Sequence, residues 1–425
     1  MTALPTSRPP LAETYSSLVA FLCGALALTA PSGYSIGPVL LLLASLSLVF
    51  RRPKLRLDGQ DRAILLVLLG YAALLILFAG LHREGSSGLA DPLRFLLAVP
   101  VLIWLLAHPP RLAWLWAGFA LGAVGAGTFA AWQKFALGLP RPDGFSHAIQ
   151  FGNLCVLLAT LCLAGLGWAS TRARRGAWYL VLGLGALGGL TGSILSGSRG
   201  GWVALLPMLA VLVAAFARRF SWKAWGALVG AGVVVAALAW VIPQTGIQKR
   251  YDQAVAEITQ YASGERISTS IGRRFDMWKG AVHLFQEKPL LGWGESAYRP
   301  AMQALAEEGR VHPDVGDYDH AHNEFFDRAA KQGAVGLLGL LALYGVPLLL
   351  FGRGLWSPDI GRRALAAAGC LLPIGFMGFG LTQSFLAHNS GVTVYAFWLV
   401  LLWSAFRHVA PREAQVPLRG RAVME

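Results

Sequence analysis

Long apolar runs recur along the whole chain and are separated by short polar segments. A run of about 20 apolar residues is long enough to cross the roughly 30 Å hydrocarbon layer of a membrane as a helix. The runs predict twelve membrane-spanning helices, with one long polar insert between the ninth and the tenth. They lie at residues 15–30, 35–50, 62–81, 91–107, 112–133, 148–168, 177–195, 201–217, 222–242, 333–351, 362–386 and 391–408.

Composition favours an all-α polytopic membrane protein. The 425 residues are 55% hydrophobic and only 14% charged, whereas about 25% of the residues of an ordinary soluble domain are charged. The runs are continuously apolar, while the strands of a membrane β-barrel alternate in polarity. We expect spans one to nine in residues 1–242, an outer cap with short helices in residues 243–332, and spans ten to twelve with a cytoplasmic tail in residues 333–425.

Basic residues predict the orientation of the spans, because short positively charged loops stay in the cytoplasm. One side of the predicted topology collects twenty of them: Arg8, Arg51, Arg52, Lys54, Arg56, Arg62, Arg111, Arg172, Arg174, Arg175, Arg218, Arg219, Lys223, Arg353, Arg362, Arg363, Arg407, Arg412, Arg419 and Arg421. The short segments of the other side hold five: Arg83, Arg94, Lys134, Arg141 and Arg199. Both termini are therefore expected in the cytoplasm. Because the formal charge of +14 is spread over such clusters, nucleic-acid binding is disfavoured.

The polar insert is expected to fold. It holds 13 of the 22 acidic residues and 11 of the 36 basic ones, with helical apolar spacing at residues 271–285 and 298–306. This composition is typical of a helical cap rather than a flexible linker. The four cysteines of the chain lie inside apolar runs without metal or redox spacing, so we expect them to be packed in the spans.

Three motifs on the predicted outer face are candidates for chemistry. The first is the turn at residues 196–202 (SGSRGGW), where Arg199 stands on the side that holds few positive charges. A charge at membrane depth is costly unless it is paired or hydrated, which makes Arg199 a candidate functional residue. The alternative is that its side chain extends to the lipid headgroups.

The second motif, residues 272–278 (GRRFDMW), leads into residues 289–294 (PLLGWG). If the first part is helical, Arg274 and Trp278 share one face at spacing i, i+4. The guanidinium group of Arg273 or Arg274 is suited to bidentate phosphate binding. The alternative is an ion pair with an acid of the same cap.

The third motif, residues 317–324 (DYDHAHNE), precedes the tenth predicted span. Histidine titrates near neutral pH, so His320 or His322 beside carboxylates is suited to accept a proton from a substrate hydroxyl. A His-x-His pair between acids is also compatible with a divalent metal or with a structural role. Asn323 follows His322 directly and is a candidate substrate contact.

Two other outer segments are weaker candidates. Arg94 lies just inside a span, where it either pairs with Asp91 at spacing i, i+3 or faces an outer cavity and its substrate. The dipeptide of His388 and Asn389 repeats the His-Asn pattern in another outer turn, and there we favour a helix cap.

Two arginines and a histidine on one membrane face suit transfer from a lipid-linked diphosphate. Breaking a sugar–phosphate bond develops negative charge on the departing diphosphate, and fixed guanidinium groups stabilise that charge where the dielectric is low. The incoming alcohol becomes a better nucleophile as its proton leaves, and a neutral histidine is suited to take it. The three motifs match these three roles.

The order of these elements resembles the O-antigen ligase and O-antigen polymerase superfamily of bacterial envelope glycosyltransferases. The resemblance covers residues 190–350 and rests on the SRGGW turn, the Arg274 to Trp278 element with PLLGWG, and HAHN before a late span. It implies a fold related to the C-type membrane glycosyltransferases. It also implies an inverting reaction that needs no metal and no cofactor, which lowers the weight of the chelation hypothesis.

The resemblance also implies roles for single residues. By position, Arg199 and Arg274 are the diphosphate contacts and His322 is the base. The spacing to Trp278 favours Arg274 over its neighbour, and the following asparagine favours His322 over the other histidine. We expect further substrate contacts from five residues, namely Arg273, His320, Asn323, Trp278 and Arg94.

Twelve spans with a single large periplasmic loop look more like the ligase branch of the superfamily. The resemblance then implies transfer of O-antigen from undecaprenyl diphosphate to a sugar hydroxyl of the lipid A-core. The active site would lie on the periplasmic face of the bacterial inner membrane, among membrane lipids. A polymerase, which uses a second lipid-linked glycan as acceptor, is the alternative within this class. A lipid or glycan transporter is a different class, disfavoured because the ionisable candidates crowd the outer surface rather than the middle of the spans.

Overall fold

The computed structural model describes residues 10–50, 53, 55–217, 247–263 and 269–409, with scattered positions between 221 and 241. Every regular element in this part of the chain is a helix, which confirms the all-α fold class. Among the described residues, eight helices are long and apolar enough to cross a membrane, and three shorter apolar helices accompany them. The predicted span at residues 222–242 lies largely outside the described residues.

The apolar helices follow the predicted runs closely. Before the insert they are α1 (Leu11–Ala25), α2 (Gly33–Ser45) extended by η1 (Leu46–Val49), α3 (Gly59–Leu81), α4 (Ala90–Ala107), α5 (Leu112–Phe135), α6 (Ala148–Ala169), α7 (Arg175–Ser196) and α8 (Gly200–Phe216). After it they are α13 (Glu324–Gly352), α14 (Ile360–Gly380) and α15 (Asn389–His408). The connection from α3 to α4 contains η2 (Gly85–Leu89), and η5 (Phe385–Ala387) lies between α14 and α15.

Two boundaries near the candidate site differ from the prediction. Helix α13 begins at Glu324 rather than near residue 333, but Gly333 has non-helical torsion angles (φ 64°, ψ −162°) that divide it at the predicted start. Helix α14 ends at Gly380 rather than at 386, because the backbone tightens there and the N–H groups of Thr382 and Gln383 both donate to the carbonyl of Phe379. The residues that follow are therefore free to form a turn.

The centre of the bundle is formed by α6, α14 and α15. In each of these helices, 83% or more of the apolar window is buried inside the protein. Small residues let helices approach closely, as is usual in membrane bundles. At Gly118, for example, a Cβ atom would lie 2.3 Å from the carbonyl oxygen of Phe21, so α5 packs directly on the backbone of α1.

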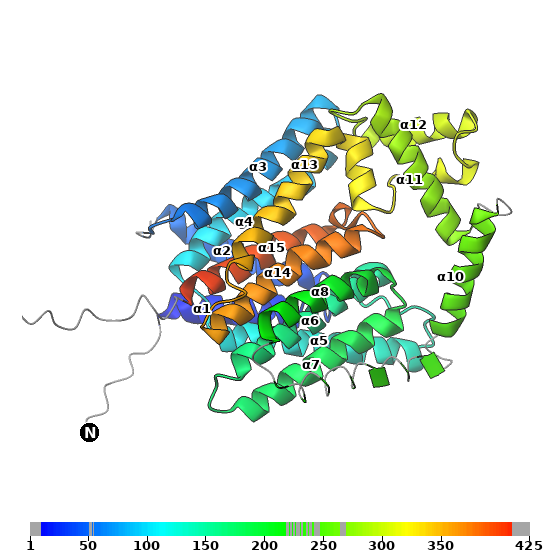
Figure 1. Cartoon of the computed structure of the whole chain (residues 1–425). Helices are drawn as coiled ribbons and strands as arrows, with labels where there is room; N and C mark the ends of the chain where they lie inside the picture. The colour runs from blue at the N-terminus through cyan, green and yellow to red at the C-terminus, as the bar shows by residue number, and fades with distance from the viewer. Residues whose placement is uncertain are drawn as a thin grey trace, which may run out of the picture.

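The described part of the insert forms three α-helices at one end of the bundle (Figure 1), namely α10 (Ile247–Ala262), α11 (Ser270–Glu287) and α12 (Glu295–Glu307), and the short helix η4 (Pro313–Val315). The helices α11 and α12 share a small apolar core with the start of α13, which includes Met277, Leu284, Tyr298, Met302 and Ala330. The two patterns of helical spacing in the insert therefore correspond to real helices, and this cap has a core of its own.

The cap docks on the kink of α13. The N–H groups of Trp293 and Gly294 donate to the carbonyls of Ala330 (3.0 Å) and Lys331 (2.8 Å). A Cβ atom on Gly333 would lie 2.3 Å from the carbonyl carbon of Leu290. These backbone contacts fix α11 and α12 relative to the segment that carries the histidine motif.

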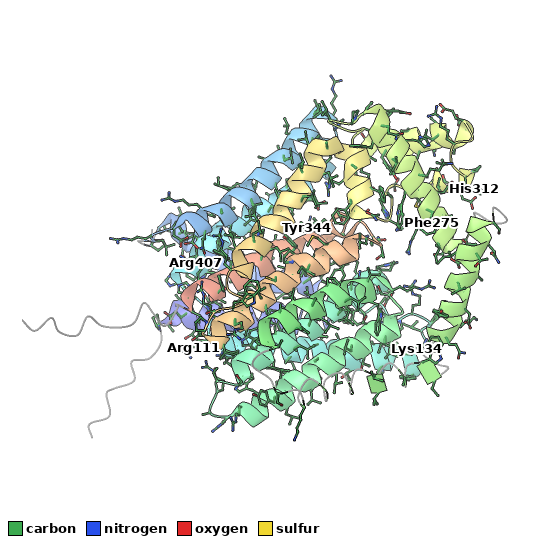
Figure 2. The ribbon with its side chains drawn as sticks, viewed as in Figure 1. Arg111, Lys134, Phe275, His312, Tyr344 and Arg407 are labelled. Carbon is green, nitrogen blue, oxygen red and sulfur yellow. The ribbon has the colours of Figure 1, made fainter. Side chains whose placement is uncertain are left out.

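The two ends of the bundle differ in the basic residues that they carry. Figure 2 shows Arg111 and Arg407 at one end, and Lys134 with the cap residues Phe275 and His312 at the other. This separation agrees with the alternation predicted from the loops.

Candidate functional site

Arg199 lies in a tight turn between two apolar helices. Gly197 ends α7 in the left-handed conformation (φ 65°), and Arg199 itself is the N-cap of α8. The hydroxyl of Ser198 donates to Oδ1 of Asn153 on α6 at 2.8 Å. The Arg199 side chain is exposed, and it makes no ion pair with any of the described residues.

Helix α11 directs Arg274 toward the same place. The helix begins at Ser270, where the N-cap residue Thr269 accepts a hydrogen bond from the N–H of Gly272 at 3.0 Å. Burial lowers the pKa of Arg274, and the positive charges of Arg199 and then Arg141 lower it further. Three guanidinium groups from three separate segments therefore lie within electrostatic range of one another.

The alternative explanation for Arg274 is an ion pair inside the cap, and the structure shows none with Asp276 or Glu287. Asp276 accepts a short hydrogen bond from the backbone of His312, and Glu287 faces Arg310 at 3.9 Å. Arg274 forms no salt bridge with a carboxylate of the described residues, although Glu257 on α10 lies close enough to raise its pKa. A group of guanidinium side chains without salt bridges is suited to bind an anion.

Arg141 is a member of this array that the sequence interpretation did not select. Its Nε donates to the carbonyl of Ser196 at 3.3 Å, in the turn that also carries Arg199. Burial, followed by the charge of Arg199, lowers the pKa of Arg141. The signal available in the sequence was its place among the five basic residues of the sparsely charged side.

His322 lies beside these arginines in a constrained backbone conformation. Its φ of 49° falls in the left-handed region, which is unusual for a residue with a side chain. Its Nδ1 lies 2.6 Å from Oε1 of Gln383, in the turn after α14. Burial lowers the pKa of His322, the hydrogen bond to Gln383 raises it, and the charge of Arg274 lowers it. The net direction is downward, which favours a neutral imidazole at pH 7.

His320 supports the neighbouring histidine. Its Nδ1 accepts the backbone N–H of His322 at 3.4 Å, and the two rings are 4.2 Å apart at 83°. Burial, and then the positive charge that His322 can carry, lower the pKa of His320 to about 4. A neutral His320 serves as the acceptor that this contact needs.

The metal hypothesis finds no geometric support in the part of the chain that the structure describes. No group of three His, Cys, Asp or Glu side chains there is arranged to hold a metal ion. Asp319, which the hypothesis would use, faces Arg299 at 3.7 Å instead.

Comparison with known proteins finds a family match over part of the chain. Residues 184–341 match the model of a family described as O-antigen ligase. This match confirms the resemblance to the O-antigen ligase and polymerase superfamily. The matched segment includes Arg199, Arg274 and His322. The chain is also similar to a protein of Haemophilus influenzae described as uncharacterized, with 26% identity over 369 residues, which cover 86% of this chain and 92% of that protein.

The family supports an O-antigen ligase or polymerase type of function in a membrane enzyme that resembles glycosyltransferases. In this family segment, two predicted contacts have structural partners. The indole N–H of Trp278 donates to the carbonyl of Ala321 at 3.0 Å, and its ring stacks on Phe326 at 5.5 Å. Asn323 is the N-cap of α13, where its Oδ1 accepts two backbone N–H groups and its Nδ2 donates to the carbonyl of Leu381 at 3.1 Å. Both side chains hold the loop that carries His322.

The remaining candidates lie at the start of α15. Arg94 pairs with Asp91 at 2.9 Å, as one of the two sequence hypotheses predicted, and also donates to Oδ1 of Asn389 at 2.6 Å. His388 occupies the N-cap position of α15 but makes no side-chain cap hydrogen bond. Its Nε2 lies 2.8 Å from Nε2 of Gln383 instead. The helix-cap interpretation is therefore wrong for the His388 side chain.

Proposed function

We propose that the protein is an O-antigen ligase that transfers a glycan from undecaprenyl diphosphate to a sugar hydroxyl of the lipid A-core. The site lies on the periplasmic face of the bacterial inner membrane. The supporting observation is the convergence of Arg199 and Arg274, neither of which forms a salt bridge among the described residues, with His322. The family match supplies the donor class, an envelope glycan carried on a lipid.

The arginines are assigned to the diphosphate of the donor. Arg199, Arg274 and Arg141 approach from the turn before α8, from α11 and from the segment before α6. A diphosphate offers two charged groups, each able to accept the paired N–H donors of a guanidinium. The array is in place before the reaction, so its attraction for the leaving group grows as negative charge accumulates there.

His322 is assigned to the acceptor. The oxygen of the acceptor hydroxyl attacks the anomeric carbon from the side opposite the diphosphate, and its proton passes to Nε2 of His322. As the new carbon–oxygen bond forms, the bond from the anomeric carbon to the diphosphate oxygen breaks. The electron pair of that bond leaves with the diphosphate. One displacement of this kind inverts the configuration at the anomeric carbon.

The test is transfer by purified protein in detergent, with a defined lipid-linked donor and two competing acceptors. One acceptor is lipid A-core and the other is a second molecule of the lipid-linked glycan. We expect glycan on lipid A-core with inverted configuration, without nucleotide or ion gradient. Growth of the lipid-linked chain alone would show a polymerase, and absence of transfer together with movement of intact lipid-linked glycan between leaflets would show a transporter.

A further inference from the structure

Gln383 forms hydrogen bonds with two histidines at the candidate site, and the proposed reaction assigns it no role. It lies in the turn between α14 and η5, where only 4% of its surface is exposed. Its Oε1 lies 2.6 Å from Nδ1 of His322, and its Nε2 lies 2.8 Å from Nε2 of His388. Both ends of one buried amide are therefore used to bind imidazole rings.

The chemistry of an amide determines where the protons lie. A carbonyl oxygen only accepts hydrogen bonds, so Nδ1 of His322 must carry a proton in this contact. In the neutral ring, Nε2 of His322 is then the unprotonated nitrogen. The amide nitrogen only donates, so Nε2 of His388 accepts and its proton is on Nδ1. With its proton on Nδ1, His388 accepts from the amide nitrogen through Nε2, and this contact favours the amide orientation that turns Oε1 toward His322.

Hydrogen bonds also hold the backbone next to His322. The carbonyl of Ala321 accepts from the indole of Trp278, and the N–H of Ala321 donates to Oδ1 of Asp327 at 2.9 Å. These bonds maintain a left-handed conformation that costs of order 1 kcal/mol or more for a residue with a side chain. In this strained backbone conformation, the His322 ring is oriented with Nδ1 toward Gln383.

We propose that Gln383 is a positioning residue that presents His322 with Nδ1 protonated and Nε2 free to accept the proton of the acceptor hydroxyl. His388 completes the arrangement by fixing the orientation of the Gln383 amide. This inference rests on the proposed function, because it assigns the geometry of the base in that reaction.

An amide and a carboxylate at position 383 have different consequences for the base. A carboxylate would also accept from Nδ1, but its charge would stabilise the protonated ring and raise the pKa of His322, by about 1–3 units. The neutral amide keeps the ring oriented and leaves it unprotonated at neutral pH. The titratable or charged groups around His322 come from several segments, namely His147 before α6, Arg274 on α11, Tyr318 and His320 in the same loop, Asp327 on α13 and His388 before α15.

The experiment compares Gln383→Glu and Gln383→Leu with wild type in detergent. Rates of transfer are measured across pH at varied donor and acceptor. In parallel, the carbethoxylation of His322 by diethyl pyrocarbonate is followed across pH by peptide mass spectrometry, which reports the protonation of this ring without requiring activity. The control is Gln303→Glu, which adds the same charge on the exposed surface of α12.

We expect Gln383→Glu to move the midpoint of His322 carbethoxylation upward by about one pH unit or more. The acidic limb of the pH profile of the transfer rate should move upward by the same amount. The rate at high pH should largely recover. Gln383→Leu should lower kcat at least about tenfold with little change in the KM for donor, while the control keeps both midpoints. As a second variant, His388→Ala should lower kcat to a smaller extent. Without His388, the side-chain amide of Gln383 is free to flip, which exchanges the positions of its oxygen and nitrogen.

Two outcomes would overturn the inference. One is an unchanged carbethoxylation midpoint in folded Gln383→Glu protein. The other is wild-type kcat in both Gln383→Leu and His388→Ala. Failure of the proposed function would give a different result from failure of this inference. Wild-type protein would then transfer no glycan, while the midpoint of His322 carbethoxylation would still shift in Gln383→Glu protein.

Discussion

At the scale of single residues, the partners of each arginine distinguish the side chains with a structural role from those available to bind a substrate. Arg94 is occupied by Asp91 and Asn389. Arg274 forms no salt bridge among the described residues, although burial makes its charge costly to keep. A buried guanidinium group without a salt bridge is suited to bind an anion, as the proposed function requires.

The pair of neighbouring arginines gives the first prediction. We expect Arg274→Ala to lower kcat about 100- to 1,000-fold, because it removes a fixed donor to the departing diphosphate. The matched control, Arg273→Ala, should retain most of the activity, since it is Arg274 that shares a helix face with Trp278 and interacts with the charges of Arg199 and Arg141. Steady-state transfer kinetics measure both variants, and equal losses would refute the assignment of Arg274.

The pH dependence gives the second prediction. Burial and the charge of Arg274 lower the pKa of His322 below its ordinary value of 6.5. Because the base must be unprotonated, kcat/KM should stay level down to pH 6.5 and fall only in more acidic solution, by about tenfold per unit. Removal of the Arg274 charge should move the carbethoxylation midpoint of His322 upward. An acidic limb well above pH 6.5 in wild-type protein would contradict this account.

Sequence patterns located these residues and favoured one of each pair of neighbours. The choice between the two arginines, and between the two histidines, depends on how α11 and the loop before α13 are oriented. Trp278 lies one helical turn after Arg274 on α11, as the spacing predicted, and its indole donates to the carbonyl of Ala321. Gln383 was assigned to a helix and belongs to no motif, because its role depends on contacts with residues far away in the sequence.

At the scale of elements, the kink in α13 connects the cap to the bundle. A straight helix would present its last outer turn to the membrane surface. The break at Gly333 instead turns residues 324–332 toward the cap, where Lys331 binds Glu295 at 2.6 Å and Asp327 at 3.2 Å. The apolar pattern predicted the span that starts at this glycine, but not the helical segment before it, which is amphipathic and packs on α11.

The kink gives the third prediction. We expect Gly333→Ala to lower the free energy of unfolding by about 2 kcal/mol or more, because φ is 64° and the new Cβ would meet the backbone of Leu290 at 2.3 Å. The control is Gly345→Ala in the same helix, where a Cβ meets nothing within 4 Å and should leave stability unchanged or improved. Thermal unfolding in detergent distinguishes the two, and similar melting temperatures would contradict the role of the kink.

At the scale of the whole molecule, the bundle was predictable because each span is encoded locally by a long apolar run. Its polar groups are sorted between two ends, with Arg111 and Arg407 at one and the cap at the other (Figure 2). Positive charge near the first end is expected to hold it in the cytoplasm. How the cap lies over the turn before α8 was not predictable, because it depends on contacts between distant segments.

Orientation gives the fourth prediction. The four native cysteines are buried, so an introduced exposed cysteine should dominate labelling by a membrane-impermeant thiol reagent. We expect Gln303→Cys in the cap to be labelled in intact spheroplasts, and Thr171→Cys in the basic loop between α6 and α7 to be labelled only after lysis. The reverse pattern would place the candidate site in the cytoplasm and rule out a periplasmic reaction.

The central claim is that Arg199, Arg274 and His322 surround one reaction site. The most direct measurement is an experimental structure of the protein with a lipid-linked diphosphate donor in a His322→Ala variant that does not turn it over. We predict the diphosphate between Arg199 and Arg274, with the anomeric carbon facing position 322. A diphosphate bound elsewhere, such as beside Arg94 or at the end that carries Arg111 and Arg407, would contradict the claim.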